Sequence, residues 1–327
     1  MKKFCVLWIS FLILFNCSFA QTPVEKNGAL SVHAQQIVNR YEDPVSLAGN
    51  SLFWSNTGWE GAKYYTGNVV RWLYQDWHAN IVRAVMGVDV NGGYLEDEKN
   101  KERVKKVVET AIETGVYVII DWHSHHAEKY ESEAIRFFRE MAALYGETDN
   151  VIYEIYNEPL DVSWSLTVKP YAEKVIEAIR EIDPDNLIIV GTPNWSQDVD
   201  SAADHPIKGY ANIAYTLHFY AGSHHEELME KASYAIEKKL PLFVTEWGTV
   251  NANGDGAVDS VWTMKWMDFC CKNHLSHCNW AITDKKEGAS ALQPGASPKG
   301  NWKEKDLTYS GKLVREIIRS WNSKCNR

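Results

Sequence analysis

The chain has 327 residues, and its 43 acidic and 34 basic side chains give a formal net charge of −9 at pH 7. This acidic balance argues against nucleic acid or an anionic lipid surface as a partner. The length is enough for one large domain with a full hydrophobic core, and six cysteines are too few for a small scaffold held together by disulfides.

The first twenty residues have the pattern of a secretory signal peptide. Two lysines precede an apolar run over residues 4–15, and the small residues Ser18 and Ala20 follow it. A membrane anchor is the weaker interpretation, because the apolar run is short for a bilayer. We therefore expect residues 1–20 to be removed before Gln21, and the mature protein to be secreted, or periplasmic in a bacterium, without a membrane span.

Four cysteines remain after that cleavage, and an exported protein can oxidise them. One or two disulfides are possible, and the spacing leaves their pairing open. The same spacing is not that of zinc ligands, so no metal is expected there. The four are Cys270, Cys271, Cys278 and Cys325.

Residues 21–43 are polar and mixed, and we expect a leader segment ahead of the main domain, which covers residues 44–327. Eight apolar, strand-like runs alternate with helical patterns in that domain. The predicted strands cover residues 45–54, 80–86, 116–122, 151–157, 187–192, 213–219, 241–246 and 277–282. The predicted helices cover residues 66–78, 98–114, 132–145, 167–182, 224–239, 257–273 and 309–321.

The alternation of strands and helices, at intervals of roughly 26 to 36 residues, is typical of parallel βαβ units. In the predicted helix over residues 98–114, Val104, Val107, Val108 and Ala111 form an apolar stripe that would face a sheet. Eight such units at this length fit a closed (β/α)₈ TIM barrel better than an open sheet. The sequence thus predicts an α/β fold with a single barrel domain.

Two of the predicted strands lead into a glutamate. Glu158 lies in an Asn-Glu-Pro turn after residues 151–157, and Glu246 ends residues 241–246. Because parallel strands end at the same mouth of a barrel, both carboxyl groups are expected in one cleft. Glycoside hydrolysis needs two such groups across the scissile bond. We interpret Glu246 as the nucleophile and Glu158 as the acid/base, with its pKa raised by the neighbouring negative charge.

Charged residues also occur in the second and third predicted strands. Arg83, inside an apolar strand, needs an anionic partner, and we expect it to keep a catalytic carboxylate ionised; a purely structural ion pair is the alternative. Asp121 is followed by three histidines, a set that could bind zinc, but helical HxxxH spacing is lacking and no metal is expected. We expect His123 to contact the substrate, and His125 and His126 to lie outside the site.

The remaining strand ends supply further candidates. Asn157 could bind the 2-hydroxyl of a sugar, Tyr220 could donate to the nucleophile, and Trp280 could form the floor of the central sugar site. Glu154 lies deeper in the barrel and is expected to be structural. Two more strand-end candidates are His218 and Trp195.

Taken together, the motifs resemble glycoside hydrolase family 5, and within it the cellulase subfamily of bacteria and plant-parasitic nematodes. The resemblance spans about Val45 to Trp321. It implies a (β/α)₈ barrel, retention of anomeric configuration, no cofactor and endo attack on β-1,4-glucan. The motifs are Ile152-Tyr-Glu-Ile-Tyr-Asn-Glu-Pro159, Val244-Thr-Glu-Trp-Gly248, Asp121-Trp-His123, Leu217-His-Phe-Tyr220 and Asn279-Trp-Ala281.

Carried over by position, the resemblance implies an acid/base at Glu158 and a nucleophile at Glu246. It implies substrate contacts at Arg83, His123, Asn157, His218, Tyr220 and Trp280, sugar-hydroxyl contacts at Lys285 and Glu287, and cleft walls at Trp54 and Trp195. The chain departs from the pattern at Phe53, where many relatives carry a histidine. Phenylalanine cannot hydrogen-bond a hydroxyl, so altered affinity at that subsite is expected.

These expectations describe a secreted, monomeric endo-β-1,4-glucanase that acts on a β-1,4-linked glucan. No carbohydrate-binding module is expected after the barrel, which favours soluble or amorphous glucan as substrate. The alternatives are the same mechanism on mannan, xyloglucan or mixed-linkage glucan, and a non-catalytic glycan-binding protein, which the two glutamates and Arg83 disfavour. Asn194-Trp-Ser196 is a glycosylation acceptor in a eukaryotic host, and we expect it to be unoccupied because it adjoins Trp195.

Overall fold

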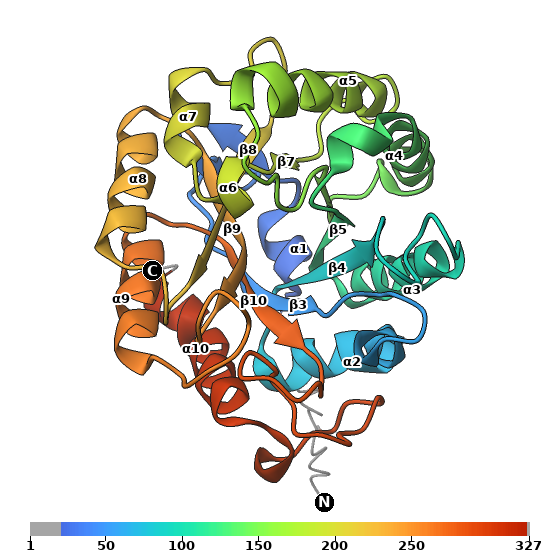
Figure 1. The fold of residues 1–327 in the computed structure, drawn as a ribbon, viewed down its shortest axis with the longest axis vertical. Coiled ribbons are helices and arrows are strands. Elements are labelled where there is room, and N and C mark those ends of the chain that lie inside the picture. The colour runs from blue at the N-terminus through green and yellow to red at the C-terminus, as the bar shows by residue number, and fades with distance from the viewer. Residues whose placement is uncertain (1–20, 326–327) are drawn as a thin grey trace, which may run out of the picture.

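The computed structural model describes residues 21–325, so the predicted signal peptide lies outside the described residues. Eight parallel strands form a closed barrel in the order β10-β3-β4-β5-β6-β7-β8-β9 (Figure 1), which confirms the predicted TIM-barrel fold. The barrel strands are β3 (Ala48–Leu52), β4 (Ile81–Gly87), β5 (Tyr117–His123), β6 (Val151–Glu154), β7 (Ile188–Val190), β8 (Ile213–Tyr220), β9 (Leu242–Gly248) and β10 (His277–Ile282).

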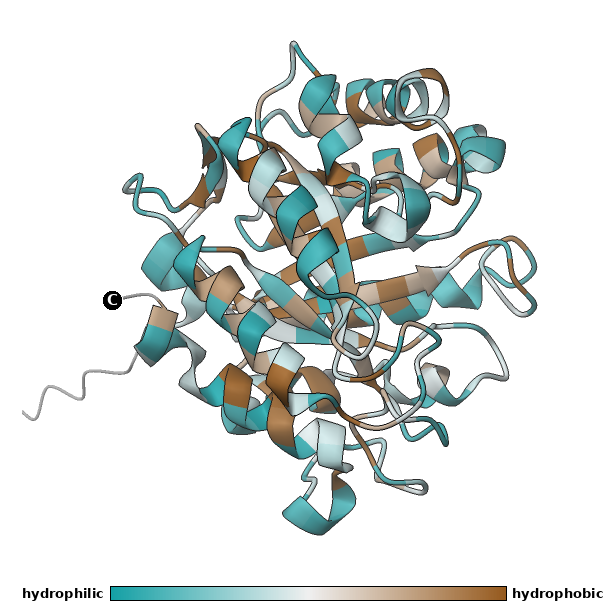
Figure 2. Cartoon of the chain, turned by 60° about the vertical axis from the view of Figure 1, so that its left-hand side comes forward, coloured by the Kyte–Doolittle hydropathy of each residue, from teal (hydrophilic) through white to brown (hydrophobic). Residues whose placement is uncertain are grey.

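Helices surround the barrel, and their polar sides face outward (Figure 2). The connection between β7 and β8 carries two short helices, α6 (Pro193–Ser196) and α7 (Val199–Asp204), where the sequence showed no clear helical pattern. None of the helices within residues 21–325 is long and apolar enough to cross a bilayer. The other outer helices are α2 (Gly67–Trp72) with the π-helical turn η2 (Leu73–Trp77), α3 (Lys99–Thr114), α4 (Glu131–Tyr145), α5 (Lys169–Arg180) after the π-helical turn η4 (Trp164–Val168), α8 (Glu226–Glu237), α9 (Ser260–Lys272) and α10 (Tyr309–Cys325).

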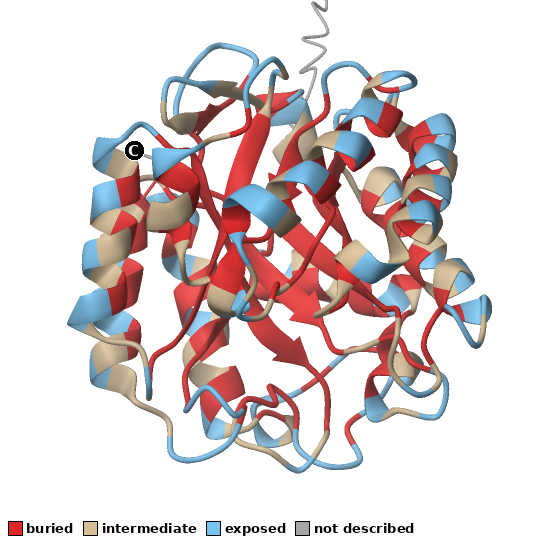
Figure 3. Cartoon of the chain, turned by 45° about the horizontal axis from the view of Figure 1, so that its top comes forward, coloured by how far each residue is buried: buried red, intermediate tan, exposed pale blue. Residues whose placement is uncertain are grey.

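Two layers of core hold the fold together, and buried residues dominate the strands (Figure 3). The outer layer lies between the sheet and the helices. Val104, Val107, Val108 and Ala111 of α3 belong to it and are fully buried, as their spacing predicted. The inner layer lies inside the barrel towards the N-terminal ends of the strands, which leaves the C-terminal ends free for polar groups.

The segment before the barrel packs against the barrel's N-terminal end. It forms α1 (Pro23–Asn27) and a hairpin of β1 (Ser31–His33) with β2 (Gln36–Val38). Leu30 and Ile37 are buried in the inner core layer, and the hydroxyl of Tyr117 on β5 donates to the carbonyl of Gly28 at 2.6 Å. The polar composition of residues 21–43 did not indicate this packing, because only a few of their side chains make it.

Barrel closure joins the first and last barrel strands. Ala48 of β3 pairs with His277 of β10, and α10 covers this junction, where the indole of Trp321 donates to Ser46 Oγ at 2.9 Å. A disulfide between Cys271 and Cys325 links α9 to the end of α10. The sequence had left the pairing open, and the structure leaves Cys270 and Cys278 as buried free thiols.

Acidification is expected to destabilise the fold through His277. Burial lowers the pKa of this ring from 6.5 to about 3, so the unfolded chain binds its proton at a higher pH than the folded chain does. Stability is therefore lost as the pH falls below 6.5, by about 2 kcal/mol between pH 7 and pH 5. Urea unfolding at both pH values should show a smaller loss for His277→Gln, whose side chain can still accept from Trp247. Equal losses of stability in the wild type and in His277→Gln would contradict the role of His277 in the acid sensitivity.

Candidate active site

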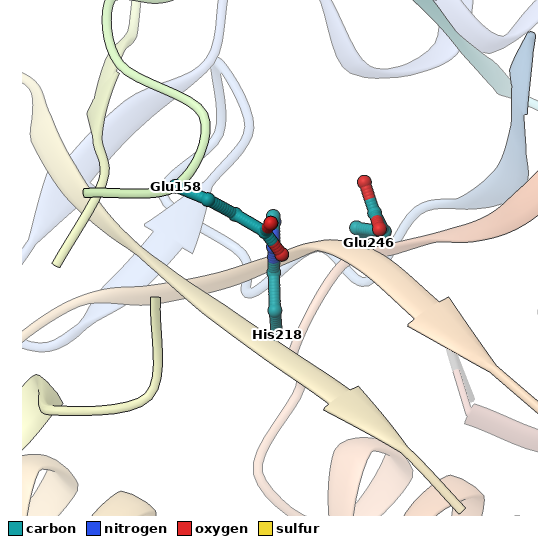
Figure 4. A group of neighbouring side chains, drawn as sticks. All are labelled: Glu158, His218 and Glu246. Carbon is teal, nitrogen blue, oxygen red and sulfur yellow. The ribbon is translucent and has the colours of Figure 1, made fainter. Parts of the chain in front are cut away.

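The two candidate catalytic glutamates meet at the C-terminal mouth of the barrel. Glu246 lies on β9, and Glu158 lies four residues beyond the end of β6. An oxygen of each carboxyl group and a ring nitrogen of His218 all lie within 4.8 Å of one another (Figure 4). Carboxyl groups this close leave no room for a water molecule between them and a sugar, and are typical of glycosidases that retain configuration.

A single guanidinium organises the floor of this site. Arg83 on β4 is fully buried and contacts Glu154 (Nε–Oε2, 2.6 Å), Glu246 (Nη1–Oε2, 2.9 Å) and Asp121 (Nη2–Oδ2, 3.0 Å). Its Nη2 also donates to Asn157 Oδ1 at 2.6 Å. The structure thus places Arg83 against the proposed nucleophile and against Glu154, which the sequence suggested was structural. Three carboxyl groups exceed one positive charge, and burial raises the pKa of Asp121 to about 7.

Glu246 accepts a hydrogen bond at each oxygen. Besides the Arg83 contact at Oε2, the phenol of Tyr220 donates to Oε1 at 2.6 Å. Burial and the neighbouring Glu246 raise the pKa of Tyr220 well above its usual value, so the phenol remains a donor. Donors at both oxygens hold the carboxyl group of Glu246 in a fixed orientation, as a nucleophile requires.

Glu158 lies in a different environment, between two histidines. His218 Nδ1 is 2.8 Å from Glu158 Oε1, and His125 Nε2 is 3.2 Å from Glu158 Oε2. Burial alone would raise the pKa of Glu158, but the hydrogen bonds to His125 and His218 outweigh it and hold the pKa below its usual range. The expected rise caused by Glu246 is therefore wrong, because the two imidazoles contact Glu158 directly.

His125 is a site residue that the sequence interpretation placed outside the site. It follows β5 two residues after His123, and the carboxylate of Glu158 raises its pKa despite burial. The sequence did contain an indication of this position, because residues i and i+2 of an extended chain point to the same side, as His123 and His125 would. His126 has no described contact with Glu158; its backbone N–H donates to Ser124 Oγ at 2.9 Å.

The rings of His123 and Trp280 are stacked in parallel, with 5.4 Å between centroids and 4° between planes. Burial lowers the pKa of His123 to about 3, so the ring is neutral; its Nδ1–H donates to Asp121 Oδ2 at 2.7 Å. Its Nε2 then remains an acceptor for a sugar hydroxyl. Asn157 complements it, because its Oδ1 binds Arg83 while its buried Nδ2 has no partner among the described residues.

Aromatic side chains continue from Trp280 along one side of the site. Phe53 packs on Trp280 (5.3 Å between centroids), and Lys285 Nζ lies 5.2 Å from the Phe53 ring. Trp54 contacts the edge of His123 (4.1 Å) and continues to Trp59 (5.5 Å), which the sequence interpretation did not single out. Lys285 also pairs with Glu287.

Trp195 lies apart from this aromatic row. It is 44% exposed, and its backbone N–H donates to the carbonyl of Pro159 at 2.8 Å, beside the Glu158 turn. The neighbouring Asn194 donates its backbone N–H to Leu160 at 3.0 Å. The absence of a glycan at Asn194 stays a prediction.

The groups around Glu158 are poorly suited to hold a metal ion. Glu158, His218 and Glu246 lie close enough together to ligate one. Both ring nitrogens of His218 are already engaged, however, with Glu158 and with Thr245 Oγ1 at 2.8 Å. Both oxygens of Glu246 also accept hydrogen bonds, so a cation would have to displace several existing contacts.

Comparison with known proteins gives consistent matches. Residues 38–286 match the model of the family Cellulase (glycosyl hydrolase family 5). Endoglucanase Z of Dickeya dadantii is 57% identical over 293 residues, which are 89% of this chain and 66% of that protein. An endoglucanase of Clostridium saccharobutylicum is 43% identical, over 90% of this chain and 66% of that protein. The chain thus spans slightly less than two thirds of the length of these relatives.

Solved structures agree with the sequence matches. A structure from Cytophaga hutchinsonii is 50% identical and superimposes with a TM-score of 0.90, covering 93% of this chain and 98% of the other. The catalytic domain of a Thermobifida fusca endoglucanase, in complex with cellotetraose, is 32% identical with a TM-score of 0.86, covering 92% of this chain and 100% of the other.

Replacement of Arg83 by lysine should affect both catalysis and folding. A lysine cannot reach Glu154, Asp121 and Glu246 at once, so buried carboxylates lose their partner. We expect kcat to fall by at least about 10²-fold, and the free energy of unfolding to fall by about 3–5 kcal/mol. Kinetics and urea unfolding measure the two effects. Arg71→Lys, in an exposed pair with Glu113, is the control and should change neither; an Arg83→Lys enzyme with near-normal kcat would refute the assigned role.

Proposed function

The chain belongs to the Cellulase family, glycosyl hydrolase family 5, and we propose that it is an endo-β-1,4-glucanase that cleaves internal bonds with retention of configuration. The observation that carries the proposal is the approach of the Glu158 and Glu246 oxygens to within 4.8 Å. Retaining glycosidases have their two carboxyl groups roughly 5–5.5 Å apart, and inverting ones roughly 6.5–9.5 Å apart.

In the first step, an oxygen of Glu246 attacks the anomeric carbon and the bond from that carbon to the glycosidic oxygen breaks. The departing oxygen takes a proton from Glu158, which becomes a carboxylate. The contacts of Glu246 with Arg83 and Tyr220, at 2.9 and 2.6 Å, support its role because they orient an ionised carboxylate. Glu158, His125 and His218 share the proton that is transferred, and Glu158 is the residue that delivers it to the departing oxygen.

In the second step, Glu158 accepts a proton from a water molecule whose oxygen attacks the same anomeric carbon. The bond from that carbon to Glu246 breaks, and the carboxylate of Glu246 returns to its contacts with Arg83 and Tyr220. Two successive inversions at one carbon give net retention, and the water supplies the proton that Glu158 lost in the first step.

We expect the substrate to be positioned by side chains that the protein holds by hydrogen bonds or packing and that still present a donor or a ring face to the sugar. The Nδ2 of Asn157 can donate to the 2-hydroxyl at the cleavage point, a contact that strengthens in the transition state. Trp280 can stack under a glucose ring, and Trp54 and Trp195 can extend the trough on either side. The cellotetraose complex of the Thermobifida fusca relative supports a glucan chain as the ligand.

Secretion is part of the proposal and rests on the signal-peptide pattern of residues 1–20. The names of the endoglucanase relatives support a glucan as the polymer, and the family name Cellulase supports a cellulose-type glucan. Hydrolysis rates on carboxymethylcellulose, glucomannan and barley glucan would rank β-1,4-glucan against the other β-glycans.

Removal of either carboxylate tests the assignment of roles. Glu246→Gln should abolish the release of reducing sugar from carboxymethylcellulose, because no nucleophile remains. Glu158→Gln should lower kcat on the same polymer by about 10²–10⁴-fold but retain the first step on a dinitrophenyl cellobioside, whose leaving group needs no proton.

The stereochemistry of the product and a control variant complete this test. Proton NMR during hydrolysis should show the β-anomer first. Glu113→Gln, at an exposed position on α3, should keep wild-type rates. Initial formation of the α-anomer, or an active Glu246→Gln enzyme, would overturn the mechanism.

A further inference from the structure

A chain of buried hydrogen bonds runs beneath the two catalytic glutamates. Thr245 on β9 donates its hydroxyl to Glu154 Oε1 at 2.6 Å, and His218 Nε2 lies 2.8 Å from the same Thr245 oxygen. At the other side of the ring, His218 Nδ1 lies 2.8 Å from Glu158 Oε1. Glu154, Thr245 and His218 are at most 1% exposed, so water does not compete for these contacts.

The geometry of this chain of hydrogen bonds fixes the number of protons that it contains. A threonine hydroxyl has a single hydrogen, and here Glu154 receives it. The contact between Thr245 and His218 then requires a hydrogen on Nε2 of the ring. A neutral His218 with that hydrogen presents a lone pair at Nδ1, which would repel an ionised oxygen of Glu158 at 2.8 Å. A proton must therefore lie between His218 and Glu158.

Reversal of all three hydrogen bonds gives the one other satisfied arrangement of a neutral ring. Glu154 would then be protonated, Thr245 would donate to His218, and Nδ1–H would donate to an ionised Glu158. The two arrangements contain the same number of protons and differ in which carboxyl group is ionised. Arg83 contacts Glu154 at 2.6 Å and has no described contact with Glu158, so it favours the ionised form at Glu154 and leaves the proton with the pair of His218 and Glu158.

We propose that Glu154 and Thr245 are positioning residues that act through His218 to hold the catalytic proton in the hydrogen bond between His218 and Glu158. This inference rests on the proposed role of Glu158 as acid/base. It adds the buried residues that keep a proton available to Glu158. The chain connects the environments of the two glutamates, because Arg83 contacts both Glu246 and Glu154.

Other ionisable groups face the same chain and contribute to its titration. His125 contacts the outer oxygen of Glu158 and is 37% exposed, so it exchanges protons with solvent in a way that the interior chain does not. The charged or titratable neighbours, apart from members of the hydrogen-bond chain, are Arg83, Asp121, His123, His125, Tyr220, His224, Glu246 and Cys278.

Substitution of Thr245 tests the chain of hydrogen bonds separately from these neighbours, because the Thr245 hydroxyl has described hydrogen bonds only with members of that chain. Thr245→Val keeps the shape of the side chain and removes the hydroxyl, so Nε2–H of His218 loses its acceptor. The ring is then expected to carry its hydrogen on Nδ1 and to donate it to an ionised Glu158. Thr245→Ser restores the hydroxyl. Thr216→Val is the matched control, because Thr216 Oγ1 also approaches Glu154 Oε1, at 3.4 Å, from the neighbouring strand but is not in the chain.

The pH profile of kcat/KM on carboxymethylcellulose is the kinetic readout. For Thr245→Val we expect the basic limb to move down by about one pH unit and kcat at pH 7 to fall about ten-fold, with KM nearly unchanged. Thr245→Ser and Thr216→Val should keep the wild-type limb. A uniform loss at every pH, or a Thr245→Ser enzyme as impaired as Thr245→Val, would overturn the proposal.

The ring nitrogens of His218 provide a readout that needs neither activity nor a variant. In ¹⁵N NMR of the full-length wild-type protein, Nε2 should carry a hydrogen across the pH range of activity; an unprotonated Nε2 would refute the inference and leave the proposed function intact. Full activity of Glu158→Gln on carboxymethylcellulose would instead refute the acid/base role. The two failures are therefore distinguishable.

Discussion

The buried guanidinium of Arg83 is the constraint on which the site depends. A charge in the interior of a barrel is tolerable only if anionic or polar partners surround it, and loss of one partner leaves another charge uncompensated. Its contacts with Asp121 on β5, Glu154 on β6 and Glu246 on β9 join strands from different parts of the chain. The same interactions that satisfy the charge therefore fix the position of Glu246, the proposed nucleophile.

The two candidate catalytic glutamates differ in their neighbours, and these neighbours suit the different roles proposed for them. Glu246 receives hydrogen bonds from a guanidinium and a phenol, which donate at every working pH. Glu158 contacts two imidazoles, which can both give and take a proton. The proposed mechanism needs one carboxylate that attacks and one carboxyl group that gives and takes a proton, and the neighbours of the two glutamates differ in the corresponding way.

Much of the architecture could be predicted from local patterns, whereas the electrostatics of the site could not. Strand and helix periodicity gave the barrel, and the Asn-Glu-Pro turn and the glutamate on the seventh barrel strand gave the pair Glu158 and Glu246. The pKa of Glu158 depends on His125 and His218, which come from other strands and approach only in the folded chain. The depth of Glu154 in the barrel likewise did not reveal that Thr245 connects it to His218. The packing of residues 21–43 was missed because burial of Leu30 and Ile37 follows from tertiary contacts.

The junction between β3 and β10 has a consequence for how the molecule can be made. Ala48 pairs with His277, so the first barrel strand finds its last neighbour only when nearly the whole polypeptide is available. The link from Cys271 to Cys325 spans 54 positions and lies outside that seam. Because this covalent link holds α10, which covers the junction, it is expected to slow the reopening of the closed barrel.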